Sequence, residues 1–171
     1  MWNRCVVLAL WMLSVAGDPW SAALAENPPA DDAVLNVWTL EGSELHITRE
    51  LWSQAARTRL KAVDHSGRLA EFEGVSATEL LKRAAAPLGG QLRGKALAIY
   101  VVAEGSDGYR AVYALPEFDA GFTDDVILIA DRRDGKALDA KEGPLRMVVP
   151  GDKREARWVR NLVSLRLLRA P

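Results

Sequence analysis

Residues 143–159, GPLRMVVPGDKREARWV, are one of two segments that stand out in the sequence. An arginine lies near the start of a β-rich run, a Pro-Gly pair ends that run, and a loop with three cations then leads into a tryptophan. Backbone amides, cations and an indole face together suit a flat, polar, electron-rich heterocycle, with or without an anionic tail. A basic surface loop with Trp158 packed in the core is the alternative interpretation.

A second polar segment is residues 106–110, Ser-Asp-Gly-Tyr-Arg. It follows the apolar run 96–103, so we expect a tight turn at the end of a buried strand, with a further strand after it. The turn places the phenol of Tyr109 beside the guanidinium of Arg110. These side chains are candidates for binding a polar ligand.

Short apolar runs alternate with turn signals over the rest of the chain. Thr48 is placed to cap a short helix that runs to residue 56, and Ser76 with Glu79 forms a capping-box pattern at the start of a helix that runs to about residue 86. The predicted strands cover residues 34–40, 45–47, 60–63, 69–72, 96–103, 109–113 and 145–149, and residues 126–130 fit a buried strand or a helical segment. This pattern predicts an α+β fold with a mixed or mainly β core.

The last predicted strand has the clearest period. Val163, Leu165 and Leu167 alternate with two polar residues, which is typical of a half-buried strand with these three side chains on the inner face.

The first 25 residues have the three parts of a secretory signal peptide. Arg4 precedes an apolar run at 5–16 that is too short to span a bilayer as a stable anchor, and Ala-Leu-Ala at 23–25 matches a cleavage site. A buried N-terminal helix is the alternative. We therefore expect residues 1–25 to be removed, residues 26–33 to form a disordered lead, and residues 34–171 to form a single domain in a bacterial periplasm.

Export leaves a chain without cysteine, because the one cysteine of the sequence is Cys5. The mature protein then has no disulfide, no thiolate metal ligand and no cysteine nucleophile. The sequence of 171 residues is 49% hydrophobic and 26% charged with a net charge of −1, as in ordinary globular proteins. A charge this close to zero argues against a protein whose main task is coating nucleic acid.

Common catalytic and metal-binding patterns are missing from the sequence. His46 and His65 are its two histidines, and neither has the spacing of a metal-binding pair, so structural or surface roles are favoured for both. The Gly-x-Ser-x-Gly pattern of many hydrolases is absent, as are the phosphate-binding glycine motifs. The acidic pair at 124–125 fits a solvated loop.

Several segments nevertheless occur in a familiar order, and they are Phe72-Glu73-Gly74-Val75, Glu79-Leu80-Leu81, Asp107-Gly108-Tyr109, residues 143–150 and Arg157-Trp158-Val159. In order and spacing, the set resembles the sulfite-oxidase-type molybdopterin-binding domain of oxidoreductases over residues 72–169. The resemblance implies a compact, β-rich α+β fold with a mixed sheet and a few short helices. It also implies a cleft for the pterin of the molybdenum cofactor.

The resemblance further implies where the pterin lies. Trp158 is expected to stack on the pterin ring, Arg146 and backbone groups beside Gly151 to meet its amide-like edge, and cations or a phenol to meet its side chain. The ligand-binding residues expected on this basis are Asp107, Tyr109, Arg146, Gly151, Lys153, Arg154, Arg157 and Trp158.

One departure from the family pattern concerns the metal. Catalytic members of the family coordinate molybdenum through a cysteine that precedes the segment matching residues 72–75. Here the corresponding stretch, residues 60–68, reads LKAVDHSGR and has no cysteine, and Asp64 and His65 are harder donors than a thiolate. We therefore expect a reduced pterin as cofactor, with molybdopterin as one candidate, and neither a metal nor a catalytic residue.

Family members without the cysteine imply a function in signalling, since some bind a metal-free reduced pterin and serve as periplasmic sensors. The resemblance therefore predicts a non-catalytic periplasmic pterin-binding protein that regulates a membrane-bound signalling partner through that partner's periplasmic domain. It predicts no nucleic-acid partner and no membrane insertion after cleavage of the signal peptide. The alternatives are a molybdenum-cofactor oxidoreductase, or a subunit of one, and a structural periplasmic adaptor.

Overall fold

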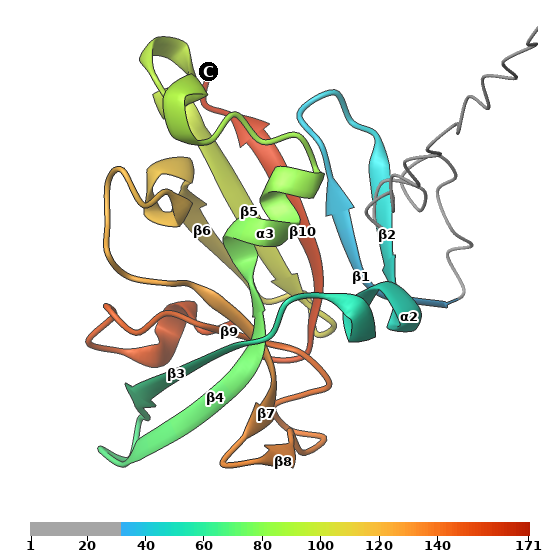
Figure 1. The fold of residues 1–171 in the computed structure, drawn as a ribbon, viewed down its shortest axis with the longest axis vertical. Coiled ribbons are helices and arrows are strands. Elements are labelled where there is room, and N and C mark those ends of the chain that lie inside the picture. Colours follow the sequence, from blue (N-terminus) through green and yellow to red (C-terminus); the bar gives the residue numbers. More distant parts are fainter. Residues whose placement is uncertain (1–31) are drawn as a thin grey trace, which may run out of the picture.

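The structure, a computed structural model that describes residues 32–171, is built around two β-sheets (Figure 1). The predicted signal peptide and residues 26–31 of the predicted lead lie outside the described residues. The first sheet has the order β2-β1-β10-β5-β6. Its strands are β1 (Ala33–Trp38), β2 (Glu44–Thr48), β5 (Ile99–Gly105), β6 (Arg110–Ala114) and β10 (Leu162–Arg169). The β1–β10 pair is parallel and the other pairs are antiparallel, so the predicted mixed sheet is confirmed.

The second sheet is antiparallel throughout. It has the order β3-β4-β7-β8, and β9 also pairs with β7. Its strands are β3 (Thr58–Val63), β4 (Leu69–Ser76), β7 (Leu128–Arg133), β8 (Lys136–Ala137) and β9 (Arg146–Val148). β3 and β4 form the hairpin predicted around residues 64–67, and the apolar run at 126–130 enters strand β7 rather than a helix.

Helices are few and short, in keeping with the predicted fold class. They are α2 (Arg49–Gln54), α3 (Ala77–Arg83) and the 3₁₀ turns η2 (Gly89–Gln91), η3 (Gly94–Ala98), η4 (Leu115–Phe118) and η5 (Glu155–Arg157). Thr48 caps α2 as predicted, since its hydroxyl accepts a 3.2 Å hydrogen bond from the Leu51 N–H. Within residues 32–171, no helix has the length and apolar character needed to cross a membrane.

The start of α3 was predicted correctly, but for the wrong reason. The helix follows Ser76, yet the Ser76 hydroxyl accepts no N-cap hydrogen bond, so the predicted capping box is wrong. The N–H of Ala77 instead donates to the Ile127 carbonyl at 3.0 Å, a partner that tertiary structure supplies. The helix also ends at Arg83, earlier than predicted, and Ala85 has φ 55°, which is incompatible with a continued helix.

Strand β10 confirms the last predicted strand but corrects its inner face. Leu165 and Leu167 are buried as predicted, whereas Val163 is 40% exposed and Ser164 is buried. The β10–β5 register shifts between Leu162 and Ser164, and this irregularity reverses the alternation at the start of the strand.

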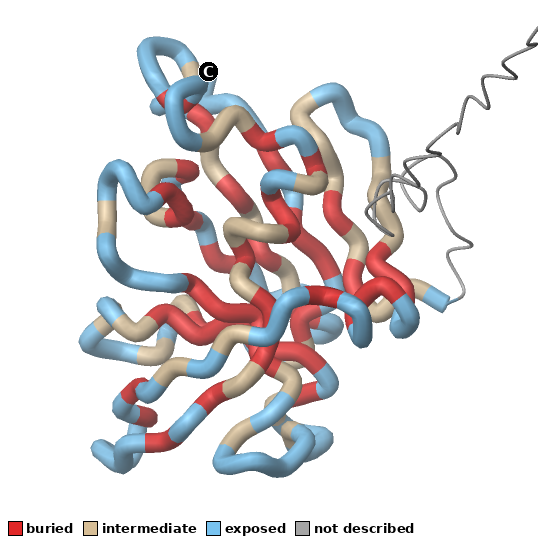
Figure 2. The backbone as a smooth tube through the Cα atoms, in the orientation of Figure 1, coloured by how far each residue is buried: buried red, intermediate tan, exposed pale blue. Residues whose placement is uncertain are grey.

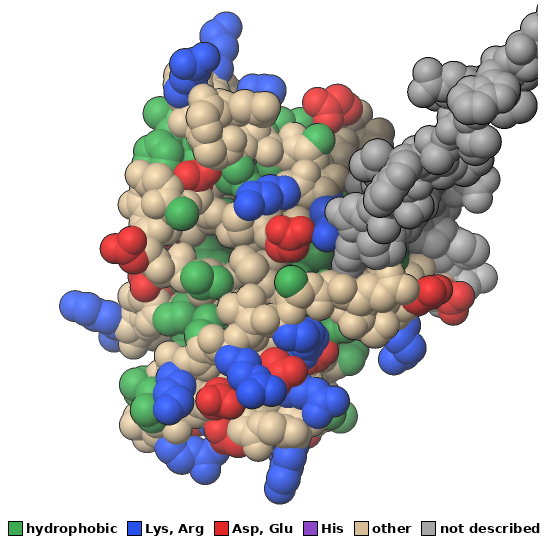
Figure 3. Space-filling model, in the orientation of Figure 1, with side chains coloured by type: hydrophobic (Ala, Val, Ile, Leu, Met, Phe, Trp, Pro, Cys, Tyr) green, Lys and Arg blue, Asp and Glu red, His purple; other side chains and the backbone are tan. Residues whose placement is uncertain are grey.

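The buried side chains form one hydrophobic cluster to which both sheets and both α-helices contribute (Figure 2). Polar contacts also connect α2 and the residues that follow it to the second sheet. Arg57 contacts both oxygens of Asp131, and the same carboxylate accepts a 2.6 Å hydrogen bond from the Trp52 indole. Figure 3 shows acidic and basic side chains intermixed over the half of the molecule that contains β3 and β4.

Candidate functional site

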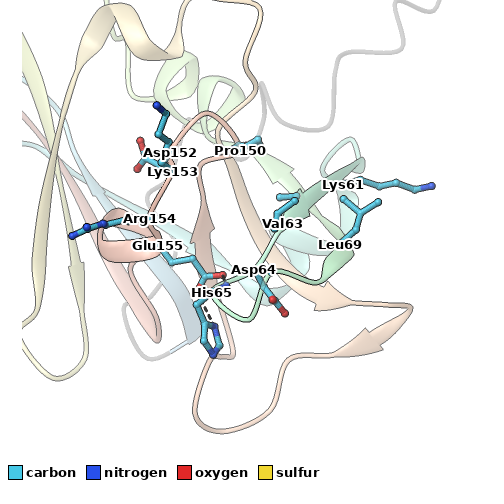
Figure 4. Close-up of a pocket in the computed structure, with 12 residues that line it drawn as sticks. Lys61, Val63, Asp64, His65, Leu69, Pro150, Asp152, Lys153, Arg154 and Glu155 are labelled. Atoms are coloured by element: carbon cyan, nitrogen blue, oxygen red, sulfur yellow. Dashed lines mark hydrogen bonds and ion pairs between the residues drawn. The ribbon is translucent and has the colours of Figure 1, made fainter.

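A cavity of about 590 Å³ lies between the β3–β4 hairpin and the loop that follows β9 (Figure 4). One wall comes from residues 61–69 at the end of the hairpin, and the other from Pro150 and residues 152–155. The volume is within the usual range of small-molecule sites. The hairpin therefore brings the stretch where the family pattern has a cysteine against the loop predicted to hold a pterin.

A second cavity of about 220 Å³ lies on the other side of η5. Asp107 and Tyr109, from the turn between β5 and β6, form one side of it, and Ala156, Trp158 and Arg160 form the other. Glu155 lines both cavities, so this carboxylate belongs to the wall between them.

A buried ionic cluster supports this shared wall. Arg146 is 0% exposed, and its two terminal nitrogens donate 2.7 Å hydrogen bonds to Glu142 and Glu155. Arg133 also contacts Glu142, at 3.5 Å, and forms an ion pair with Asp64. Buried charges are costly to desolvate unless they are paired and hydrogen-bonded, and the terminal nitrogens and carboxylates of these five groups pair with one another. The buried Nε atoms of Arg133 and Arg146 have no hydrogen-bond partner among the described residues.

Aromatic rings cover both guanidinium groups of the cluster. Arg133 and Arg146 lie 5.5 Å and 5.9 Å from the centre of the Phe72 ring, and Arg146 lies 5.2 Å from the centre of the Trp158 ring. Phe72 and Trp158 meet edge to face at 5.8 Å. The rings exclude water from the cluster and add cation–π attraction.

The acidic side chains that line the larger cavity are engaged by the protein itself. Hydrogen bonds from the Ser66 hydroxyl and from the N–H groups of Ser66 and Arg68, with Arg133 beside them, hold the pKa of Asp64 well below its usual range. Glu155 accepts from the His65 N–H at 2.9 Å and lies 3.3 Å from His65 Nδ1.

Asp152, the third acid of the cavity, forms a 2.6 Å ion pair with Arg157. Arg157 also pairs with Glu117 at 2.9 Å, and it lies over the Tyr113 ring at 5.0 Å. These two carboxylates raise the pKa of Arg157 above its usual value, and Asp152 has the larger effect.

Three cations surround the cavity without such partners. Lys61, Lys153 and Arg154 form no ion pair with any residue in the described part of the chain. In Figure 4 their charged ends point outward from the cavity toward solvent. Because the acids are neutralised by arginines, these three cations leave the rim positive and suited to an anion.

The profile described as the oxidoreductase molybdopterin binding domain matches residues 30–171. The chain belongs to this family. The resemblance inferred from the sequence is thereby confirmed, and the family's molybdopterin-binding character applies to this domain at that general level.

A solved structure agrees with the family assignment. The fold is similar to that of the sulfane dehydrogenase SoxCD from Paracoccus pantotrophus, with a TM-score of 0.60 and 21% sequence identity. The match covers 84% of this chain and 40% of that chain, so this protein spans less than half of that chain's length. At this identity the likeness shows the fold alone. A search of curated proteins gives no match.

The expected ligand-binding residues of this family member fall into four groups. Lys153 and Arg154 line the larger cavity, whereas Asp107, Tyr109 and Trp158 line the smaller one. Arg146 is fully buried behind the wall, where it supports Glu155. The other two residues, Gly151 and Arg157, lie in the same loop but line neither cavity.

The two aromatic candidates differ in accessibility. Trp158 is 3% exposed, and its indole N–H donates to the Val149 carbonyl at 3.0 Å, so its stacking on a pterin stays a prediction that requires the surrounding residues to move. Tyr109 is 50% exposed and its hydroxyl donates to the Ala156 carbonyl at 2.6 Å. The Tyr109 ring is therefore the accessible aromatic surface beside the smaller cavity.

Sequence reasoning missed two contributors to the site. Neither Glu155 nor Lys61 was singled out from the sequence, although both line the larger cavity. The predicted hairpin around residues 64–67 was the available signal, because its tip had to contact some other loop. The sequence does not identify that loop.

Proposed function

We propose that this chain is a non-catalytic pterin-binding protein that is exported to the periplasm, where it senses a reduced pterin and regulates a membrane-bound signalling partner. Family membership supports a pterin as the class of ligand. The signal-peptide pattern of residues 1–25 supports export. The partner rests on the resemblance to members that lack the cysteine.

The observation that carries the non-catalytic part is the composition of the larger cavity. Residues 61–65, from the stretch that holds the cysteine in catalytic members, line this cavity, and they include no sulfur donor. Asp64 is engaged by Ser66, Arg68 and Arg133, and His65 Nδ1 faces Glu155. Within residues 32–171, no group of three or more His, Cys, Asp or Glu is arranged to hold a metal ion. The donor set therefore does not fit a protein-ligated molybdenum.

The remainder of the cofactor fits the same cavity better. The apolar side chains of Val63, Leu69 and Pro150 line the cavity together with polar and charged side chains. A site for a planar heterocycle needs both kinds of lining. Lys153 and Arg154 at the rim suit a phosphate or another anionic group on the pterin side chain. This chain would thus bind and orient a pterin and shield it from water, without a bond-making step.

The decisive experiment is to purify the mature protein from a host that makes the molybdenum cofactor, denature it, and analyse what is released. We expect mass spectrometry to find a pterin near one equivalent and elemental analysis to find molybdenum well below one equivalent. One equivalent of molybdenum together with dye-linked redox activity would instead establish the oxidoreductase alternative. Neither pterin nor metal, with partner binding intact in a Trp158→Ala variant, would establish the adaptor.

Export is tested separately by isolating the periplasmic fraction and measuring the intact mass of the protein. We expect the mass of residues 26–171, because cleavage is predicted after Ala25. A full-length chain retained in the cytoplasm would contradict this part of the proposal.

A further inference from the structure

Strand β3 is an edge strand, and its open side faces the larger cavity. In the second sheet β3 pairs with β4 only, among the described residues. The loop that forms the other wall of the cavity lies on the side of β3 away from β4 (Figure 1). A strand edge carries unpaired backbone donors and acceptors, so the cavity is bordered by backbone groups as well as side chains.

The register of the hairpin shows which backbone groups face outward. The N–H of Asp64 donates to the Arg68 carbonyl at 2.9 Å, which makes residues 64 and 68 a hydrogen-bonded pair. Pairs alternate along an antiparallel ladder, so Ala62↔Ala70 is hydrogen-bonded, whereas Lys61↔Glu71 and Val63↔Leu69 are not. The N–H and C=O groups of Lys61 and Val63 therefore point away from β4.

The cavity at this edge has the size of a small molecule rather than of another strand. Its volume of about 590 Å³ is bounded on the far side by Pro150 and residues 152–155. Val63 and Leu69, which are paired across the hairpin, are 57% and 60% exposed beside it. These apolar side chains flank the outward backbone groups of Val63, as would suit a flat ring whose polar edge meets the strand.

We propose that the lactam edge of the pterin forms hydrogen bonds with the outward N–H and C=O groups of Val63 on β3. A pterin edge has an N–H donor next to a carbonyl acceptor, which is the pattern that a strand edge offers in reverse. This inference rests on the proposed function and specifies its recognition element. Arg146 was expected to meet the amide-like edge of the pterin, but its side chain is 0% exposed. In this inference the backbone of β3 meets that edge instead.

Proline substitutions test the inference, because proline removes a backbone N–H. At Lys61 and Val63 that N–H is not part of the ladder, so proline is tolerated at such edge positions. We expect Val63→Pro to weaken binding of tetrahydropterin at least about tenfold, since a buried ligand group loses its partner. Circular dichroism and thermal unfolding establish that each variant is folded.

Matched controls separate the backbone from other effects. Arg59→Pro removes an outward N–H of the same strand outside the cavity lining. This variant should bind tetrahydropterin as the parent does. A ligand-side control avoids the folding question: a 2,4-diaminopteridine, which lacks the lactam, should bind the parent at least about tenfold more weakly.

The outcomes distinguish failure of this inference from failure of the proposed function on which it rests. If the parent protein does not bind tetrahydropterin, the proposed function fails. If the parent binds it, and a folded Val63→Pro variant and the diamino analogue bind equally well, the strand-edge inference is overturned while the proposed function stands.

Discussion

The guanidinium of Arg146 donates a 2.7 Å hydrogen bond to Glu155 from a position with no solvent exposure. Glu155 lines both cavities, so this buried pair connects the core to the wall between them. Removing one partner of such a pair leaves the other charge buried and uncompensated.

We therefore expect Arg146→Met to lower the free energy of unfolding by about 3–5 kcal/mol, because Glu142 and Glu155 lose their shared partner. Urea titration followed by circular dichroism measures the change. Arg154→Met is the matched control, since Arg154 is exposed and should change stability by at most about 0.5 kcal/mol. Equal effects at the two positions would show that the cluster does not stabilise the wall.

Trp158 is a structural residue in the absence of ligand. Its ring packs against Phe72 and beneath Arg146, and 3% of its surface is exposed. We expect Trp158→Ala to cost about 3–5 kcal/mol of unfolding free energy.

The control for this prediction is Trp38→Ala. The Trp38 ring lies 3.8 Å from the Arg166 guanidinium on the first sheet and is only partly buried, so the loss should be clearly smaller. A Trp158→Ala variant as stable as the parent would show that Trp158 does not stabilise the fold and is available to stack on a ligand.

The rim cations should contribute to the binding of an anionic group on the pterin rather than to recognition of the pterin ring. We expect Lys153→Glu with Arg154→Glu to weaken binding of a phosphorylated pterin about tenfold at low ionic strength and to leave tetrahydropterin binding unchanged. At about 0.5 M salt the difference should shrink, because exposed charges are screened. Calorimetry measures each affinity.

Arg93 and Lys95 provide the matched control, because they are exposed and lie outside the cavity lining. Their double change to Glu should leave both affinities as in the parent. A loss of tetrahydropterin binding in the Lys153 and Arg154 variant would mean that these residues contact the ring.

Local features of the fold followed from the sequence where the chain supplies its own partners. The Thr48 cap acts over three residues, and the β3–β4 hairpin closes over a four-residue turn, so short-range patterns predicted both. The helix after Ser76 starts through a carbonyl of residue 127, and the irregular register of β10 depends on β5. Neither partner is adjacent in sequence.

The same distinction explains the site. Residues 152–156 and Trp158 of the predicted loop, and Asp107 and Tyr109 of the predicted turn, line cavities, while their role in binding a ligand stays a prediction. The burial of Arg146 was not foreseen, because it depends on Glu142 and Glu155 approaching from both sides. An arginine in a sequence predicts a charge, and only the fold shows whether that charge meets solvent, ligand or carboxylate.

Acid should destabilise the protein partly through Asp64. Its pKa is lowered first by the Ser66 hydroxyl, then by the N–H groups of Arg68 and Ser66 and by Arg133. Between the folded value and an unfolded value of about 3.9, the unfolded chain binds more protons, so this stabilisation is complete above that value and is lost as the pH falls below it.

We expect Asp64→Asn to be less stable than the parent at neutral pH but to lose less stability on acidification. Ser66→Ala, which removes the largest contribution and keeps the carboxyl, should fall between the two. Urea midpoints measured across the acid range provide the comparison. An Asp64→Asn variant with the parent's full acid sensitivity would assign that sensitivity to other groups.

Gly74 lies in β4 where this strand pairs with β7, and the neighbouring backbone leaves no room for a side chain. A Cβ atom at this position would lie 1.9 Å from the Ile129 carbonyl oxygen and 2.6 Å from the Ala130 Cα, both of which are backbone atoms of the neighbouring strand region. Relief requires the two strands to separate, which would disturb the ladder from Gly74↔Ala130 to Ser76↔Leu128. Such overpacking costs about 1–3 kcal/mol or more.

We therefore expect Gly74→Ala to lower the unfolding free energy by at least about 3 kcal/mol or to abolish soluble expression, because backbone atoms cannot yield as a flexible side chain does. Gly90→Ala is the control: a Cβ there has no neighbour within 4 Å, so the change should be neutral or slightly stabilising. Thermal unfolding of both variants measures these changes in stability. A stable Gly74→Ala protein would show that β4 and β7 do not approach as closely as described.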